Sequence, residues 1–496
     1  MSPSRKLKIL FVTPEVLPFV KTGGLADVSA ALPQKLQELG HQVRIVVPKY
    51  GAIDERKYKI HEVVRLKDLT VNLGEKEVRF SLRSSFLEGQ RARVQIYFLD
   101  NDEYFGTRHS LYNDPLTGES YTDNDERFIL FAKSIFELIN KLGWVPDIIH
   151  CNDWQCGLVP AILKKCYGDS EELSQIKTLF TIHNLGEQGE FELPTFDKTG
   201  LPEELKDEKY MLHKGKVNFM KTGLLFSDLI NTVSENYAQE ICNDETFGAG
   251  LHTILSGRKE DISGIINGID VKLWNPETDS LIVKNYSSKN IEDKYENKKH
   301  LLEKFGLDFN ENTPVIGMIS RLNDNKGFDL ISQCFSKLME LDIQLVILGN
   351  GDKKYHQFLE EALFDHSEKF GCYLGYDEEL AHLIEAGSDM FLIPSRFEPC
   401  GLNQMYSLVY GTVPIVRETG GLADTITKFN GDETGNGFVF KEYSCAEMLK
   451  EVTRAVQLFK EDKKSWQRLI KTGMKSDFGW LDSSKNYVDL YKELLN

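Results

Sequence analysis

Several features that would indicate a secreted or membrane-bound protein are missing from this sequence. Its eight cysteines include no Cys-x-x-Cys pair, and their scatter over 496 residues predicts reduced thiols in a cytosol-like compartment. The apolar run that follows Lys8 ends at Pro14, which makes it too short for a signal peptide. No stretch is long enough to cross a membrane as a helix. The sequence therefore predicts a soluble cytoplasmic protein without a membrane partner.

An excess of basic residues is also missing. The chain has 59 Lys and Arg against 76 Asp and Glu, a formal net charge of −17. Binding to duplex nucleic acid needs a basic surface, so we expect no nucleic-acid partner. An anionic ligand would have to be held by local cations and helix N-termini, because the overall field of the protein repels it.

Motifs for metals and dinucleotides are absent or incomplete. The Asp-x-Asp pattern at 123–125 has no companions at ligand spacing, and we interpret it as a helix N-cap. The segment 100–105 fails as a calcium loop because Tyr104 and Phe105 fill ligand and glycine positions. Lys354 stands where a Gly-x-Gly-x-x-Gly fingerprint starting at 349 needs glycine, and no P-loop exists. We therefore expect no metal site and no cofactor.

What is present is enough apolar material for two or three domains, 41% of 496 residues. In the second half, short apolar runs alternate with amphipathic helical patterns. Strict alternation of strand and helix predicts parallel pairing in a doubly wound sheet. The expected strands are 315–319, 344–348, 372–374, 390–393, 414–416 and 437–440. The expected helices between them include 330–341, 378–386, 402–409 and 446–459.

The first half repeats this pattern with more insertions. Its expected strands are 8–12, 43–47, 94–99, 147–150, 178–182 and 229–233. Pro33 falls inside the first helical pattern, where we expect a kink or a new segment. We place one domain at 1–258, a second at 259–475, and a final helix at 476–496 that packs back on the first half. The fold class is α/β, with two Rossmann-like doubly wound domains facing across a deep cleft.

The hexapeptide Thr-Gly-Gly-Leu-Ala-Asp occurs twice, at 22–27 and at 419–424. Each copy follows a short apolar run and opens a helical pattern. A glycine pair between strand and helix lets the backbone approach a ligand, with free N–H groups at the positive end of the helix. A single copy would be interpreted as a tight turn. Two identical copies, one near each end, indicate ligand-binding turns in two nucleotide-type domains.

Ligands of doubly wound sheets lie beyond the carboxyl ends of the strands, so the loops after strands are informative. Arg321 and Lys326 follow one strand and suit a pyrophosphate or similar dianion. Gly351 lies in a tight turn with exposed amides after the next strand. Glu398, between tight-turn residues, offers a carboxylate for sugar hydroxyls. This combination favours a nucleotide-sugar over a plain nucleotide.

In the first half, two strand ends carry polar residues: Asp153 follows one strand, and His183 and Asn184 follow another. A histidine just beyond an apolar run is a candidate for the reacting face of a site. A satisfied loop histidine is the equally weighted alternative.

Taken together, these segments resemble the glycogen and starch synthases, which are retaining glucosyltransferases of the two-domain GT-B fold. The resemblance covers nearly the whole chain. It is carried by Lys-Thr-Gly-Gly-Leu-Ala-Asp at 21–27, Ile-Ile-Asn-Gly-Ile-Asp at 265–270, Trp-Asn-Pro at 274–276, Ser-Arg-Leu at 320–322 with Lys-Gly at 326–327, Glu-Pro-Cys-Gly-Leu at 398–402, and the segment 410–424 that holds the second hexapeptide.

The resemblance implies transfer of glucose from ADP-glucose to the non-reducing end of an α-1,4-glucan, glycogen or a maltooligosaccharide, with retention and without a metal. It implies catalytic roles for His183, Arg321, Lys326 and Glu398. The donor-binding residues it implies are Lys21, Gly23, Gly24, Asp153, Gly351, Tyr376, Cys400, Gly401, Leu402, Thr419 and Gly420. The acceptor-facing residues it implies are Glu15, Asp27, Tyr104 and Asn184.

Two departures from the family pattern lie on the glucan side. The family usually has His-Asp-Trp-His where this chain has Asn-Asp-Trp-Gln at 152–155. It usually has an aromatic residue after His-Asn, where this chain has Gly-Glu-Gln at 186–188. Both bear on acceptor length or preference.

Two other readings stay open from the sequence. One is a different GT-B transferase that uses UDP-glucose or a small acceptor. The other is a non-catalytic glucan-binding or scaffold protein built on the same fold. A dehydrogenase lacks support because the dinucleotide glycine fingerprint is missing. The oligomeric state does not follow from the sequence.

Overall fold

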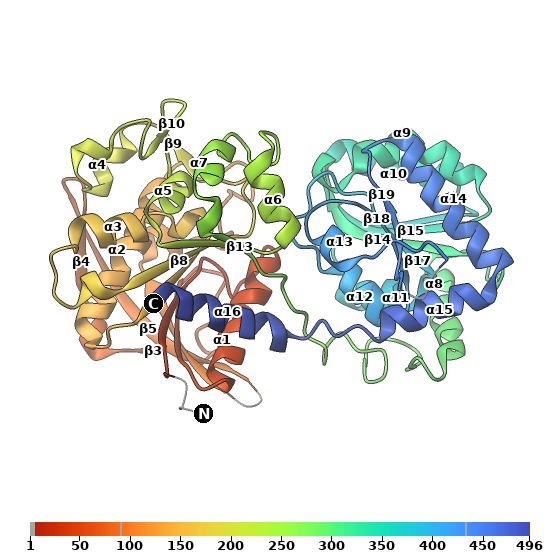
Figure 1. The fold of residues 1–496 in the computed structure, drawn as a ribbon, viewed down its shortest axis with the longest axis horizontal. Coiled ribbons are helices and arrows are strands. Elements are labelled where there is room, and N and C mark those ends of the chain that lie inside the picture. Colours follow the sequence, from red (N-terminus) through yellow and green to blue (C-terminus); the bar gives the residue numbers. More distant parts are fainter. Residues whose placement is uncertain (1–4, 90–91, 432–433) are drawn as a thin grey trace. The chain divides into compact units, whose positions relative to one another are not determined.

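The computed structural model describes residues 5–89, 92–431 and 434–496, which form two compact units (Figure 1). The first unit comprises the chain up to Val233, Ala238–Ile265 and Trp480–Asn496. The second comprises Ser234–Tyr237 and Ile266–Gly479. The main passage between the units thus lies between Ile265 and Ile266, and the chain returns to the first unit at Trp480.

The first unit is built on a sheet of strand order β13-β12-β8-β7-β1-β2-β6-β5-β3. From β13 to β6 all neighbours are parallel. These parallel strands are β1 Lys8–Val12, β2 Gln42–Pro48, β6 Arg93–Asp100, β7 Ile148–Asn152, β8 Lys177–Ile182, β12 Leu229–Thr232 and β13 Ile262–Gly264. The six strands expected from the sequence are all present, which confirms the doubly wound pattern.

The other edge of this sheet is antiparallel and was not predicted. Strand β5 (Lys76–Glu88) pairs antiparallel with β6, and β3 (His61–Glu62) and β4 (Leu69–Leu73) pair antiparallel with β5. A small separate sheet joins β9 (Glu190–Phe191), β10 (Leu212–His213) and β11 (Lys216–Asn218).

The second unit has one fully parallel sheet, of order β16-β15-β14-β17-β18-β19. Its strands are β14 Val315–Leu322, β15 Gln344–Gly351, β16 Phe370–Leu374, β17 Met390–Ile393, β18 Val413–Arg417 and β19 Phe438–Phe440. The predicted strands are therefore confirmed, with differences only at their ends. The order reverses at β14 and β17, where ligands of such sheets bind.

Helices connect the strands of both units. Those up to the crossing are α1 Gly24–Glu38, α2 Asn124–Leu142, α3 Val159–Cys166, α4 Thr195–Thr199, α5 Phe219–Phe226, α6 Glu235–Asn243 and α7 His252–Gly257. Those after it are α8 Lys294–Phe305, α9 Phe328–Glu340, α10 Lys353–Asp365, α11 Glu378–Gly387, α12 Asn403–Val409, α13 Gly420–Thr425, α14 Cys445–Glu461, α15 Lys463–Met474 and α16 Trp480–Leu495.

Helix α1 does not restart at Pro33, contrary to the expectation of a new segment. It runs over Gly24–Glu38 with Pro33 inside and buried. Leu32 and Leu36 lie on the same helical face and are fully buried. Burial of this face on both sides of the proline holds the helix together despite the missing N–H.

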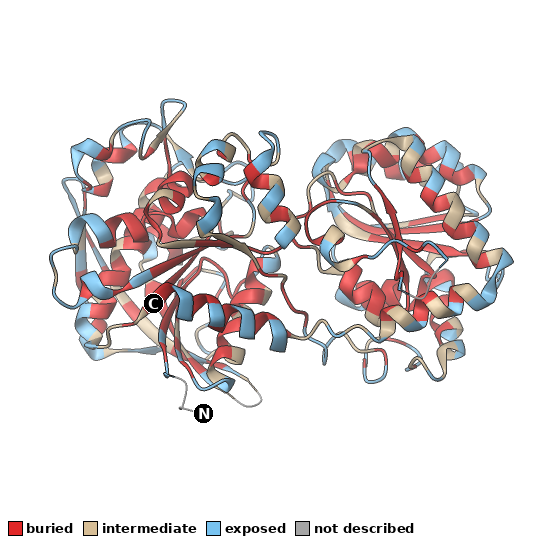
Figure 2. Ribbon diagram, viewed as in Figure 1, coloured by how far each residue is buried: buried red, intermediate tan, exposed pale blue. Residues whose placement is uncertain are grey.

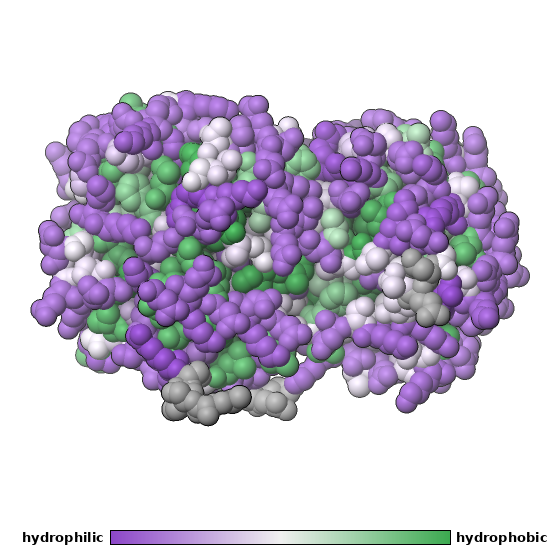
Figure 3. Space-filling view, in the orientation of Figure 1, coloured by the Kyte–Doolittle hydropathy of each residue, from purple (hydrophilic) through white to green (hydrophobic). Residues whose placement is uncertain are grey.

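The sheet of the second unit is buried on both faces, as its colouring in Figure 2 shows. Leu345 and Ile347 pack with α9 and α14 on one face. Val346 and Leu348, whose side chains alternate with these, pack with α8 and α11 on the other. Polar side chains dominate the face seen in Figure 3 over the helices of both units. Among the described residues, no helix is long and apolar enough to span a bilayer.

The expectation of reduced thiols is wrong for one pair of cysteines. Cys334 in α9 and Cys445 in α14 form a disulfide, with their Cα atoms 5.7 Å apart. They are 111 residues apart in the sequence, and only the packing of α9 against α14 brings them together. Spacing along the chain could not indicate this pair. The free cysteines are Cys151, Cys156, Cys166, Cys242, Cys372 and Cys400.

Helix α16 packs on α1 and on β8 of the first unit. Its Tyr491 hydroxyl lies 2.8 Å from Nδ1 of His150, which is fully buried in β7. Its Tyr487 hydroxyl accepts a hydrogen bond from Asn231 in β12 (3.3 Å). The last helix is thus tied to the central strands of the first unit by polar contacts inside the core.

Candidate active site

In the second unit, the loops after β14 and β17 bring a cation and a carboxylate together. The Nζ atom of Lys326 lies 2.7 and 2.6 Å from the two carboxylate oxygens of Glu398. The hydroxyl of Ser395 donates a third hydrogen bond to Glu398 (2.9 Å). Glu398 is only 8% exposed. Because β14 and β17 are the strands where the sheet order reverses, this pair lies at the expected ligand position of the fold.

Backbone geometry positions Lys326. The short 3₁₀ turn Asp324–Lys326 is capped by Asn323, whose Oδ1 accepts from the Lys326 N–H (3.0 Å). Gly327 follows with φ +83°, and a Cβ there would lie 2.3 Å from the carbonyl oxygen of Pro394. Only glycine allows this close approach, which lets the two loops meet.

The second hexapeptide packs directly on the backbone of Glu398. A Cβ on Gly420 would lie 1.9 Å from the Glu398 carbonyl oxygen, and one on Gly421 would lie 2.0 Å from that of Cys400. The Gly421 N–H donates to the carbonyls of Glu398 (3.1 Å) and Pro399 (3.2 Å). This glycine pair therefore fixes the position of the loop at 398–402.

The rest of that loop is also held from within the unit. Gly401 has φ +73°, and Nε2 of Gln404 donates to the carbonyls of Cys400 (3.1 Å) and Gly401 (3.0 Å). Burial raises the pKa of the Cys400 thiol to about 12, so it stays protonated. The helix α12 starts at Asn403, one residue after Leu402, so Glu398 lies before the helix and not in its first turn.

Three more predicted residues lie at the same end of this sheet. Arg321 is an exposed residue near the end of β14 and pairs in register with Asn350 of β15. The N–H of Gly351 donates to the side chain of Asn350 (2.9 Å), and a Cβ there would lie 2.4 Å from the Leu322 carbonyl oxygen. Tyr376 precedes α11 and is 76% exposed.

In the first unit, Glu15 organises the first hexapeptide. Its carboxylate is buried and accepts from the N–H groups of Thr22 (2.6 Å) and Gly23 (3.3 Å), and from the Thr22 hydroxyl. The Tyr112 hydroxyl donates to the same carboxylate (2.9 Å). The expectation that the amides of this turn are free is therefore wrong for Thr22 and Gly23, because an internal carboxylate occupies them.

The remaining residues of this motif lie nearer the surface. Lys21 is exposed, and its Nζ lies 2.9 Å from the carboxylate of Asp27. Gly24 is the first residue of α1, and Gly23 is its N-cap. A Cβ on Gly23 would meet nothing within 4 Å. The first copy of the hexapeptide thus has open space where the second has tight backbone contact.

The ends of β7 and β8 bring Asp153, His183 and Asn184 together. The Asp153 carboxylate accepts from the N–H groups of His183 (2.7 Å) and Asn184 (3.4 Å). Asp153 has φ +56°, an uncommon backbone conformation for a residue with a side chain. Burial lowers the pKa of His183 to about 3 and raises that of Asp153 to about 8, so both favour the neutral form at pH 7.

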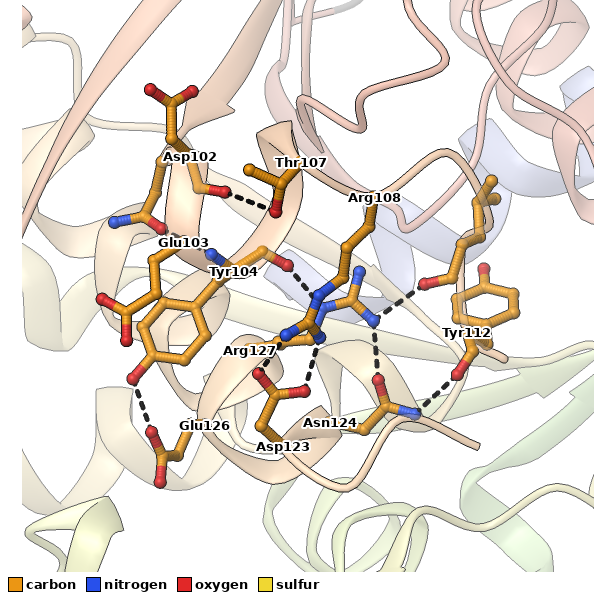
Figure 4. Close-up of polar contacts among 12 residues, drawn as sticks. Asp102, Glu103, Tyr104, Thr107, Arg108, Tyr112, Asp123, Asn124, Glu126 and Arg127 are labelled. Carbon is orange, nitrogen blue, oxygen red and sulfur yellow. Dashed lines mark hydrogen bonds and ion pairs between the residues drawn. The ribbon is translucent and has the colours of Figure 1, made fainter. Parts of the chain in front are cut away.

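Tyr104 has its hydroxyl turned toward charged partners within the unit (Figure 4). Its hydroxyl donates to Glu126, as Figure 4 shows. Outside that view, Lys76 donates to the same hydroxyl (2.9 Å). Its carbonyl accepts from Nε of the fully buried Arg127 (2.7 Å). The side chain is 1% exposed. The acceptor-facing role of Tyr104 stays a prediction.

Figure 4 also shows Asp123, the first residue of the Asp-x-Asp pattern at 123–125. Asp123 stands at the N-cap position of α2, but its carboxylate binds the guanidinium of Arg108 and does not cap the helix. The interpretation of this pattern as a helix N-cap is therefore confirmed for the position of Asp123, although a bidentate ion pair with Arg108 takes up its carboxylate. Among the described residues, no group of three or more His, Cys, Asp and Glu side chains is placed to hold a metal ion.

The structure therefore gathers the predicted residues into local groups within each unit. In the second unit, Lys326 and Glu398 meet beside the second hexapeptide. In the first, Asp153 joins His183 and Asn184. Sequence reasoning missed Ser395 and Tyr112, which bind the two predicted glutamates. Ser395 lies two residues after the end of β17, which was a usable signal. Tyr112 lies 97 positions from Glu15 in the sequence, so no local signal could have found it.

Comparison with known proteins finds relatives over nearly the whole chain. Residues 8–257 match the family described as the starch synthase catalytic domain, and residues 301–476 match the glycosyl transferases group 1 family. A relative named glycogen synthase from Thermosipho africanus is 43% identical over 99% of both chains. Another from Desulforudis audaxviator is 41% identical over 99% of this chain and 97% of its own.

Solved structures give the same result. The catalytic domain of starch synthase IV from Arabidopsis thaliana, bound to ADP and acarbose, superposes with a TM-score of 0.87 at 32% identity. It covers 99% of this chain and 100% of its own. Sucrose-phosphate synthase from Thermosynechococcus elongatus has a TM-score of 0.60 at 16% identity, which supports the fold alone. The chain therefore belongs to the glycogen and starch synthase family of two-domain GT-B glycosyltransferases.

Proposed function

We propose that this enzyme transfers glucose from ADP-glucose to the non-reducing end of an α-1,4-glucan, with retention at the anomeric carbon and without a metal ion. The observation that carries this proposal is the contact between Lys326 and Glu398 at the switch point of the second sheet. It combines a cation for a diphosphate with a carboxylate for sugar hydroxyls. The ADP bound to the related starch synthase IV makes adenine the favoured base.

The donor side of the reaction belongs to 259–475 in this proposal. Lys326 and Arg321 stabilise the negative charge that grows on the leaving diphosphate. A lysine has three N–H donors, and the two carboxylate oxygens of Glu398 accept at most two of them, so one is left for a phosphate oxygen. Glu398 holds glucosyl hydroxyls together with the backbone at 400–402. Thr419 and Gly420 complete the donor site, with Gly351 and Tyr376 toward the nucleotide.

The acceptor side belongs to 1–258, with the helix at 476–496 as its support. His183 lines the reacting face, where its ring, neutral at pH 7, carries no charge toward the sugar. Asp153, Lys21 and the glycines at 23–24 contribute to donor binding. Glu15, Asp27, Tyr104 and Asn184 serve the acceptor side, and Glu15 acts by holding the turn at 22–23.

Donor and acceptor specificity can be tested in one experiment. Nucleoside diphosphate release is measured with ADP-glucose and with UDP-glucose, each with glycogen, with maltose and without an acceptor. We expect rapid release only for ADP-glucose with a glucan. Equal release without a glucan, or a preference for UDP-glucose, would overturn the proposal in favour of another GT-B activity.

Retention and metal independence are separate parts of the proposal. The new linkage should be α-1,4 by NMR of an extended maltooligosaccharide, and a β-linked product would contradict retention. The rate should be unchanged by EDTA, because Lys and Arg side chains neutralise the diphosphate. A rate that falls with EDTA and returns with Mg²⁺ would exclude this part of the proposal.

A further inference from the structure

Asn152 is the last residue of β7 and lies directly beneath His183. It is fully buried, and its Oδ1 lies 2.9 Å from Nε2 of His183. A side-chain amide has one acceptor oxygen and two N–H donors, so its orientation decides what Asn152 presents to the His183 ring.

The orientation of the Asn152 amide follows from its neighbours. Its Nδ2 lies 3.0 Å from the carbonyl oxygen of Val12 and 3.4 Å from that of His150. Two carbonyl oxygens can only face the NH₂ group, because an amide oxygen there would repel both. The amide oxygen must therefore face His183.

An amide oxygen can only accept a hydrogen bond, so Nε2 of His183 must carry the proton. In a neutral imidazole the other nitrogen, Nδ1, is then an acceptor. The backbone of His183 is held independently, because its N–H donates to Asp153 (2.7 Å). His183 is thus held at two points, its backbone by Asp153 and its ring by Asn152.

We propose that Asn152 is a positioning residue that locks His183 in the Nε2–H tautomer and so presents Nδ1 as an acceptor for a hydroxyl of the bound sugar. The contact with sugar rests on the proposed function; the tautomer does not. An amide neither gains nor loses a proton at physiological pH, so this tautomer is the same across the working range. A histidine at 152 could itself exchange protons and would allow either tautomer.

The titratable groups around His183 do not oppose this assignment. Asp153 binds its backbone, and Glu15 and Glu187 act on Asp153 at longer range. His150 lies on the other side of Asn152 and is itself neutral, since burial lowers its pKa to about 3. The pKa of His183 is lowered by the same cause, which leaves the ring neutral at pH 7.

The test is ¹⁵N NMR of the imidazole nitrogens in the full-length enzyme, with the His183 signals assigned from a His183→Gln variant. We expect the Nε2–H pattern from pH 6 to pH 8 in the native enzyme. A Nδ1–H pattern or a cationic ring at pH 7 would overturn the inference without reference to any variant or to activity.

Asn152→Leu gives the second arm, because leucine fills the same space without an acceptor. We expect His183 to show a mixture of tautomers and kcat to fall on the order of 10²-fold, as for a misplaced catalytic contact, with the donor KM changed less. Asn231→Leu is the matched control. Asn231 is an equally buried amide in β12 whose Oδ1 binds Thr181 and not His183.

The control should leave the His183 tautomer unchanged. If Asn152→Leu keeps a pure Nε2–H pattern, Asn152 does not set the tautomer and the inference fails. If the native enzyme shows the expected tautomer but transfers no glucose, the proposed function fails while the role of Asn152 stands.

Discussion

At the scale of single residues, the two identical hexapeptides have different neighbours. Gly23 caps α1 with φ −151°, and a Cβ there would have open space around it. Gly420, at the same position of the second copy, has φ +44° and faces the Glu398 carbonyl oxygen. Identical sequence therefore leaves room at the first turn and fixes a neighbouring loop at the second. The repetition indicated two sites, but only the structure distinguishes these roles.

The matched pair Gly420→Ala and Gly23→Ala tests this difference. A Cβ at 420 would lie 1.9 Å from backbone, so Gly420→Ala must displace the loop of Glu398 and should cost about 1–3 kcal/mol of stability. Gly23→Ala should cost less, at most about 1 kcal/mol, because alanine is only a poorer N-cap and meets no backbone there, and it should weaken donor binding. Urea unfolding and donor KM measure the two effects. Equal stability of the two variants would contradict the assignment.

Lys326 provides the second residue-scale prediction. Lys326→Gln keeps a hydrogen-bond donor for Glu398 but removes the charge, so kcat should fall on the order of 10²-fold because the leaving diphosphate loses a cation. Lys304→Ala is the control, since that lysine is an exposed side chain of the same unit that pairs with Glu379 (3.2 Å). Steady-state kinetics with ADP-glucose and glycogen measures both. A native rate for Lys326→Gln would exclude its role in the chemistry.

At the scale of elements, the parallel strands were predictable and the antiparallel edge was not. Strands such as β14 and β15 are buried on both faces and read as continuous apolar runs. Strand β5 instead alternates buried and exposed residues, with Val78, Phe80 and Leu82 inward. This alternation is typical of a strand with one solvent-exposed face, and a search for continuous apolar runs does not detect it.

The same limit applies to the site. Residues in the loops that follow apolar runs, such as Lys326, Glu398 and His183, could be found because strand ends meet at one edge of a sheet. The partners that hold them could not. Tyr112 reaches Glu15 across 97 positions of sequence, and no local pattern encodes such a contact.

Helix α16 allows an element-scale prediction, because hydrogen-bond directions through the core can be assigned. Asn231 donates to the Tyr487 hydroxyl, so its Oδ1 accepts from Thr181, whose oxygen must then accept from Nε2 of His150. Nδ1 of His150 is left to accept from Tyr491 (2.8 Å). Helix α16 thus contacts both ends of this buried chain of hydrogen bonds. Tyr491 donates to His150 at one end, and the Tyr487 hydroxyl accepts from Asn231 at the other.

Tyr491→Phe should therefore leave the buried Nδ1 of His150 without a donor. We expect the unfolding free energy of the first unit to fall by about 1–3 kcal/mol. Lys492→Ala, on the exposed side of the same helix, should change it by no more than about 0.5 kcal/mol. Urea denaturation of both variants measures the difference, and a Tyr491→Phe protein as stable as the control would refute the assigned chain.

At the scale of the whole molecule, the chain forms two units with separate sheets, and its only described disulfide lies inside the second. The chain passes from the first unit to the second between Ile265 and Ile266, whereas the sequence placed its boundary at 258. The alternation of strands and helices in the sequence indicates the number of domains, because each sheet needs its own hydrophobic core. It does not reveal covalent links between helices, and the disulfide was accordingly missed.

Two units with separate cores should unfold in two calorimetric transitions. A reducing agent should lower the midpoint temperature of the second unit's transition and leave that of the first unit unchanged. The bond between Cys334 and Cys445 closes a loop spanning 111 positions of sequence. Cross-linking a loop of that length restricts the unfolded chain and contributes about 4 to 5 kcal/mol. A Cys334→Ser/Cys445→Ser variant should show the lowered transition without reductant and no further change with it.

Thiol titration of the denatured native protein should find the six free cysteines, rising to eight after reduction. Eight thiols before reduction, or a shift of the first unit's transition, would contradict a disulfide confined to the second unit.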